Sequence, residues 1–85
     1  MPEISRFPGI IIAMYYRDHS PPHFHAVYGD FEVTVQIGTG EVQGFLPRRV
    51  LSAVQEWRRI HEAELASAWE LARTNQTLPR ILPLE

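Results

Sequence analysis

The chain has 85 residues, of which 45% are hydrophobic and 21% are charged. This composition is typical of a folded globular protein and argues against general disorder. The length predicts a single domain, residues 1–85, with a thin core. The net charge is only −2, from eight Arg, no Lys and ten acidic residues. Such a balance argues against tight, non-specific binding of nucleic acid by the surface as a whole.

The chain contains no Cys, which excludes disulfides, a thiolate nucleophile and Cys-ligated zinc. Its first residues lack the basic start and the long apolar stretch of a signal peptide. The longest uninterrupted apolar run, Ile10 to Tyr16, has seven residues, whereas a membrane-spanning helix needs about 20. We therefore expect a cytoplasmic protein without a membrane partner.

Residues 9 to 45 show the patterns of β-strands that are separated by short turns. Strands are expected at residues 10–16, 23–28, 31–37 and 41–45. Gly29 and Asp30 form a two-residue spacing that suits a tight hairpin. Because all the connections are short, a four-stranded antiparallel β-meander is the simplest topology.

Residues 47 to 73 show the spacing of an amphipathic helix. Pro47 suits a first helical position, and apolar residues then recur every three or four positions from Val50 to Ala72. One straight helix of ~26 residues would be about 39 Å long, against an expected radius of gyration of ~12 Å. We therefore expect a kink or break near residue 61 and helical packing on one face of the sheet, which makes the fold class α+β. The proline-containing apolar segment 78–84 is expected to lie extended over the body or over a partner.

Three of the four His lie within the seven residues H-S-P-P-H-F-H, from His19 to His25. In an extended strand His23 and His25 project from one face, and Phe24 projects from the other. The two His Cβ atoms then lie roughly 7 Å apart. This spacing is compatible with a shared metal ion and also with two imidazoles on either side of a phosphate.

The first hypothesis is a metal site that uses Asp18, His19, His23 and His25. Imidazoles together with one carboxylate suit Zn, Fe or Ni, and they leave coordination positions open for water. The sequence leaves open whether the chain holds such a divalent transition metal or no cofactor at all.

The second hypothesis is metal-free cleavage of RNA, with His23 and His25 as the acid–base pair. Asp18 would orient an imidazole, and Arg17 would hold the phosphate. Arg48 and Arg49, at the start of the predicted helix, are the alternative phosphate ligands.

The third hypothesis is a non-enzymatic interaction or regulatory module, in which the histidines only hold the proline-rich turn. It assigns the imidazole hydrogen bonds to the backbone, to Asp18 or to Tyr hydroxyls. The sequence does not decide between an enzyme and a binding module, and it leaves homo-oligomers open.

The segment D-H-S-P-P-H-F-H-A-V-Y-G, together with P-E-I-S-R-F before it and G-F-L-P-R-R and E-W-R-R-I-H-E-A-E-L after it, resembles the domain of unknown function 4160 family. The hallmark of that prokaryotic family is D-H-x-P-P-H-F-H, which matches Asp18 to His25. The resemblance extends from Pro2 to Leu84 and departs at Pro8, where the family more usually has another residue.

Members of this family are typically encoded beside a second small protein of another uncharacterised family. The resemblance implies that this chain is the toxin, of the DhiT type, in a type II toxin–antitoxin module. Its partner would then be a small antitoxin-like protein that the neighbouring gene encodes and that holds the toxin inactive.

Overall fold

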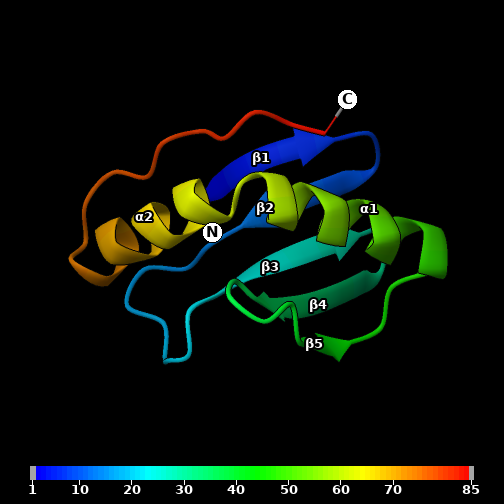
Figure 1. Cartoon of the computed structure of the whole chain (residues 1–85), viewed down its shortest axis with the longest axis horizontal. Coiled ribbons are helices and arrows are strands. Elements are labelled where there is room, and N and C mark those ends of the chain that lie inside the picture. Colours follow the sequence, from blue (N-terminus) through cyan, green and yellow to red (C-terminus); the bar gives the residue numbers. More distant parts are fainter. Residues whose placement is uncertain (1, 85) are drawn as a thin grey trace.

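The computed structural model describes residues 2–84 and shows an α+β fold with one sheet and one helical layer (Figure 1). The strands of the sheet are β1 (Glu3–Phe7), β2 (Ile10–Ala13), β3 (His23–Tyr28), β4 (Phe31–Gln36) and β5 (Val42–Gly44). The helices are α1 (Arg48–Ile60) and α2 (Glu62–Arg73), and both lie across the same face of the sheet.

The sheet is an antiparallel meander in the order β1-β2-β3-β4-β5, so it has one strand more than the sequence predicts. The additional strand is β1, in which a bulge between Glu3 and Ser5 buries Ile4 and Ser5 in succession. This bulge hides the alternation on which strand prediction depends. Pro8 lies in the turn between β1 and β2, outside both strands.

The core lies between the sheet and the helices and is centred on Trp57 of α1, whose side chain is fully buried. The Trp57 ring packs against Phe7 of β1 and Phe24 of β3, with ring centroids 5.8 and 5.6 Å apart. Phe24 is fully buried as well, so this face of β3 belongs to the core. His23 and His25, its neighbours in the strand, therefore project from the opposite face.

The expected break in the helical segment is confirmed at His61. His61 separates α1 from α2, and its φ and ψ of −111° and 23° lie outside the helical range. A straight helix from residue 48 to 73 would be about 39 Å long, whereas the longest extent of the described chain is 33 Å. The break thus keeps the helical layer over the sheet. None of the helices formed by residues 2–84 is long and apolar enough to span a bilayer.

The segment after α2 runs extended beside β1, which agrees with the expectation that it lies over the body. The backbone N–H of Ile81 donates a 2.7 Å hydrogen bond to the carbonyl of Ile4, and the Ile81 side chain is buried. The Trp57 indole N–H donates to the carbonyl of Leu82 at 2.9 Å. The tail therefore covers the outer edge of β1 and is bound to the centre of the core.

Glu3 binds Arg80 of the same tail and Arg6 of β1, and these contacts predict a pH dependence of stability. The guanidinium groups of Arg6 and Arg80 donate to the Glu3 carboxylate and lower its pKa from 4.5 to about 2. Because the pKa is lower in the folded state, this stabilisation is complete above pH 4.5 and is lost as the pH falls towards 2. We expect Glu3→Gln to flatten the decline of the unfolding free energy in that interval, measured by urea unfolding at several pH values. Superimposable plots of unfolding free energy against pH for the variant and the unchanged protein would contradict this. The control is Glu56→Gln, at an exposed site without an ion pair in residues 2–84.

Gly44, at the end of β5, is the glycine whose replacement we expect to be most costly. Its φ is +107°, and a Cβ atom there would lie 2.7 Å from the carbonyl oxygen of Glu32. Gly29 in the hairpin turn has a φ of +58° and open space around it. We expect Gly44→Ala to lower the unfolding free energy by about 3 kcal/mol and Gly29→Ala by only about 1 kcal/mol. Urea unfolding checks both values, and equal losses would contradict the expectation.

Candidate metal centre

The connection between β2 and β3 returns Asp18 to the side chains that project from β3. We call the sheet face opposite the helices the open face; it carries His25, Thr34 and Gln43, which are neighbours across β3, β4 and β5. The connection is tied down on both sides of Asp18. The Arg17 N–H donates to the carbonyl of Ala72 in α2 at 3.2 Å, and the Ile37 N–H donates to the carbonyl of Pro22 at 3.0 Å.

Asp18, His23 and His25 converge on one point, and we call these three residues the His–Asp cluster. The Asp18 Oδ2 atom lies 2.9 Å from Nε2 of His23 and 3.4 Å from Nε2 of His25. One ligand atom from each residue lies within 4.8 Å of the other two. The cluster is well shielded, because the His23 and His25 side chains are only 7% and 14% exposed.

The other nitrogen of each cluster imidazole contacts an oxygen that only accepts hydrogen bonds. His23 Nδ1 lies 2.8 Å from the carbonyl oxygen of Pro21, and His25 Nδ1 lies 3.1 Å from a carboxylate oxygen of Glu32. The carbonyl contact places a proton on Nδ1 of His23, and the same tautomer of His25 lets its Nδ1–H donate to Glu32. In the neutral rings, the two Nε2 lone pairs then face the Asp18 carboxylate, which repels them. A positive charge at the centre, either protons on Nε2 or a metal ion, removes this repulsion.

Two of the three distances between ligand atoms in the cluster suit a metal ion. Ligand atoms ~2.05 Å from one ion lie about 2.9 Å apart at a right angle and about 3.3 Å apart at the tetrahedral angle. The two Nε2–Oδ2 distances of 2.9 and 3.4 Å are close to these values. The same two rings also show the hydrogen bonding that metal-bound His has, with Nδ1–H donated to a carboxylate or a backbone carbonyl.

Opposing effects act on the Asp18 carboxyl. Its burial raises its pKa, but hydrogen bonds from the His19 ring and backbone N–H, together with those that His25 and His23 donate when their Nε2 atoms carry protons, outweigh burial and hold the pKa well below its ordinary value. Asp18 is therefore a carboxylate at neutral pH, as a metal ligand must be.

His19 lies beside the cluster but is not part of it. Its Nδ1 contacts the second Asp18 oxygen, Oδ1, at 2.7 Å, and its side chain is 83% exposed. The structure thus brings together three of the four residues of the predicted metal set.

Of the predicted phosphate-binding arginines, Arg17 is the neighbour of Asp18 in the chain, whereas Arg48 and Arg49 lie far from the cluster. Arg17 precedes Asp18 but is exposed, and its side chain makes no hydrogen bond or ion pair within residues 2–84. Arg48 and Arg49 begin α1 at the opposite end of the molecule from residues 17–22 (Figure 1). Those two arginines are therefore too far away to hold a phosphate at His23 and His25, which corrects that alternative.

Sequence reasoning missed three residues that contact the cluster, namely Glu32, Tyr15 and Trp69. Glu32 binds His25, the Tyr15 ring lies 4.5 Å from the His25 ring, and the Trp69 ring lies 5.3 Å from the His23 ring. The position of Glu32 could have been predicted from the hairpin at residues 29–30. A two-residue turn pairs residue 27 with residue 32 and places Glu32 diagonally from His25 on the open face. Nothing comparable in the sequence links α2 to β3.

The chain matches the protein family described as Domain of unknown function (DUF4160) over residues 9–70, well over half of its length. Neither the comparison with curated proteins nor the comparison with solved structures found a match. The matched region contains the whole His–Asp cluster and Glu32 and leaves out β1 and the C-terminal tail. The chain therefore belongs to the DUF4160 family.

Proposed function

We propose that this protein binds a divalent transition-metal ion through Oδ2 of Asp18, Nε2 of His23 and Nε2 of His25. The observation that carries the proposal is the pair of Nδ1 hydrogen bonds, to Pro21 and to Glu32, which turn both Nε2 lone pairs towards one carboxylate oxygen. A metal ion is the centre for which such an arrangement is preorganised.

Two neutral imidazoles and one carboxylate suit Zn²⁺, Fe²⁺ or Ni²⁺ better than Mg²⁺ or Ca²⁺, which prefer all-oxygen sites. Three protein ligands also leave at least one coordination position for water or substrate. When bound in such a site, Zn²⁺ supplies a hydroxide nucleophile near neutral pH. The proposed reaction class is therefore metal-assisted hydrolysis.

Metal-free acid–base cleavage of RNA is the second candidate, because protons on the two Nε2 atoms also satisfy the contacts with Asp18. Its proposed phosphate ligand is Arg17, which directly precedes Asp18 and whose exposed side chain makes no hydrogen bond or ion pair within residues 2–84. The two candidates differ in one measurable property, which is the metal content.

The test is metal binding by protein that is purified without a His tag. We expect elemental analysis and calorimetric titration with Zn²⁺, Co²⁺ and Ni²⁺ to give about one equivalent of bound metal. The d–d absorption of bound Co²⁺ should indicate nitrogen and oxygen ligands. Less than about a tenth of an equivalent under all these conditions would overturn the metal proposal and leave the acid–base candidate.

Glu32 should contribute to metal affinity although it is not a ligand. Its carboxylate holds Nδ1–H of His25, and loss of such a contact typically weakens metal binding about 10- to 100-fold. We expect a decrease in this range for Glu32→Ala and a smaller one for Glu32→Gln, whose amide oxygen still accepts a hydrogen bond. Asp30→Asn, a change of the same charge in the adjacent exposed turn, is the control. Equal Co²⁺ affinities of Glu32→Ala and the unchanged protein would contradict the expectation.

The assignment as the toxin of a two-gene module stays a prediction that rests on the sequence resemblance, because the matched family is described only as a domain of unknown function. Its test is induction of this protein alone in a bacterial host. Normal growth in the presence of folded protein would argue strongly against a toxin.

A further inference from the structure

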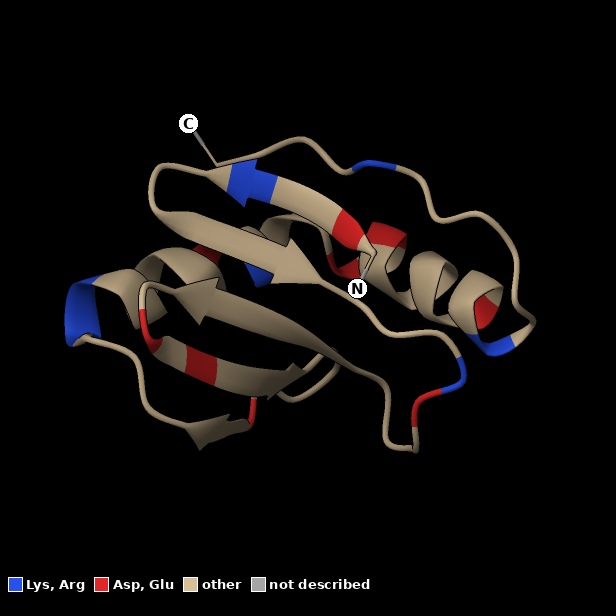
Figure 2. Cartoon of the chain, turned by 180° about the vertical axis from the view of Figure 1, so that it is seen from behind, with Lys and Arg blue, Asp and Glu red and all other residues tan. Residues whose placement is uncertain are grey.

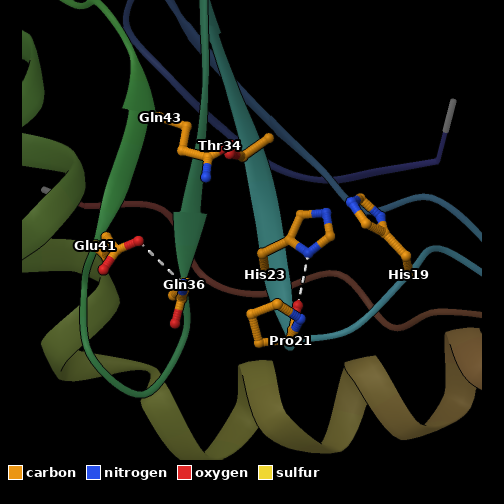
Figure 3. Close-up of a pocket in the computed structure, with 7 residues that line it drawn as sticks. All are labelled: His19, Pro21, His23, Thr34, Gln36, Glu41 and Gln43. Atoms are coloured by element: carbon orange, nitrogen blue, oxygen red, sulfur yellow. Dashed lines mark hydrogen bonds between the residues drawn. The ribbon is translucent and has the colours of Figure 1, made fainter.

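A small pocket on the open face adjoins the His–Asp cluster (Figure 3). His23 belongs to both the pocket and the cluster, because its ring forms one wall of the pocket while its Nε2 atom contacts Oδ2 of Asp18. The pocket has a volume of about 90 Å³, far below the ~300–1,000 Å³ of sites that enclose a whole drug-sized ligand. It has room for one compact chemical group. Its polar walls are His19, His23, Thr34, Gln36, Glu41 and Gln43.

Two of these polar side chains have unused hydrogen-bonding capacity. Thr34 and Gln43 are cross-strand neighbours on β4 and β5, and neither side chain makes a hydrogen bond within residues 2–84. Gln36, by contrast, is held by Glu41 and Thr39. A hydroxyl and a carboxamide, with both donors and acceptors, are thus available beside His23.

The charge around the pocket argues against a phosphate. No Lys or Arg lines the pocket, and strands β2 to β5 carry none (Figure 2). The nearby charged groups of the open face are instead carboxylates, with Glu41 in the wall and Asp18 and Glu32 at the cluster. Even with a divalent ion bound, these three carboxylates outnumber its two positive charges, and no basic side chain lines the pocket to attract an anion.

We infer that the pocket holds a small uncharged polar group of the carboxamide class, which belongs to a substrate whose neighbouring oxygen binds the metal. Thr34 and Gln43 would hydrogen-bond the N–H and C=O of that group. This inference rests on the proposed metal site and names the substrate class for it, namely neutral amide-bearing molecules rather than phosphodiesters.

The test uses protein loaded with Co²⁺ and two probes that coordinate metals, acetohydroxamic acid and inorganic phosphate. Acetohydroxamic acid chelates a metal ion through its two oxygens as the hydroxamate and keeps an amide N–H for the pocket, whereas phosphate has no such N–H. We expect acetohydroxamic acid to bind more tightly than phosphate, measured by changes in the Co²⁺ absorption. The double variant Thr34→Val/Gln43→Leu should bind acetohydroxamic acid about tenfold more weakly, since it loses roughly two hydrogen bonds, and should keep its Co²⁺ affinity. The matched control Gln76→Leu/Thr77→Val changes the same residue types at exposed sites outside the pocket.

Each outcome decides the inference. Equal affinity of the double variant and the control for acetohydroxamic acid would overturn it, as would tighter binding of phosphate or no binding of acetohydroxamic acid by the unchanged protein. In these cases Co²⁺ still binds and the metal proposal stands. If the unchanged protein does not bind Co²⁺, the metal proposal fails and the inference fails with it.

Discussion

Replacing His23 with alanine is expected to lower the metal affinity of this protein by more than about a hundredfold. The change removes one of three ligand atoms, and loss of a residue that only orients a ligand already costs about 10- to 100-fold. It also leaves the carbonyl of Pro21 without its 2.8 Å hydrogen bond from the ring. Calorimetric titration with Zn²⁺ or Co²⁺ measures the effect directly.

A folded variant is needed for this comparison, because the His23 ring is nearly buried and packs against Trp69. His25→Ala is therefore the second variant, since its side chain is more exposed and should be easier to replace. His61→Ala is the matched control, because His61 contacts Glu64 and lies outside the cluster. Far-UV circular dichroism establishes that each variant is folded. Unchanged affinity in both folded cluster variants would refute the assignment of His23 and His25 as ligands.

Metal binding should also appear as added stability. A ligand that binds only the folded state at a hundred times its dissociation constant stabilises by about 2.7 kcal/mol. We expect this gain for the unchanged protein and for His61→Ala, and little gain for His23→Ala. The two readouts are independent, because one measures bound metal and the other measures unfolding.

The sequence predicted the part of the site that depends on strand geometry. An extended segment after Pro22 necessarily places His23 and His25 on one face and Phe24 on the other, and the structure has this arrangement. The sequence did not determine the position of Asp18, because the path of residues 17–22 depends on contacts with α2 and with Ile37 after β4. Those contacts are long-range, and no local pattern encodes them.

The fold shows the same limit at its edges. The helix break at His61 followed from length alone, since one straight helix exceeds the size of the chain. Strand β1 was missed because its bulge removes the alternation of buried residues. The tail that covers this strand is also distant in sequence, since the N–H of Ile81 binds the carbonyl of Ile4. Elements whose burial depends on distant segments are those that periodicity describes least well.

The cluster gains its rigidity from this architecture. His23 and His25 project from β3, the middle strand of the sheet, whose core face is fixed by Phe24 against Trp57. Sites on a packed strand hold their geometry better than sites on a loop. Asp18, on the connecting loop, is the proposed ligand that does not project from a strand. The stability of the Trp57 core therefore determines whether the two imidazoles stay in place.

Trp57→Ala is expected to be the most destabilising single change, with a loss of about 3–5 kcal/mol in the unfolding free energy. The side chain is fully buried between Phe7 and Phe24, so its removal leaves a large cavity, and the carbonyl of Leu82 loses its partner. A small domain has only about 5–15 kcal/mol of total stability, so the variant should be largely unfolded at moderate urea concentrations. Trp69, the other Trp of the chain, still reports unfolding by its fluorescence.

Trp57→Phe separates the two contributions of this side chain. It keeps an aromatic ring against Phe7 and Phe24 but cannot donate a hydrogen bond to Leu82. The unfolding free energy should therefore fall by roughly 1 kcal/mol for the lost hydrogen bond, in addition to the loss caused by the smaller ring. Because that bond fastens the tail to the core, we expect faster amide exchange at Ile81 in Trp57→Phe, while exchange within β3 stays slow. If Trp57→Ala unfolded within about 1 kcal/mol of the unchanged protein, the packing of β3 would not depend on Trp57, and the rigidity of the cluster would need another source.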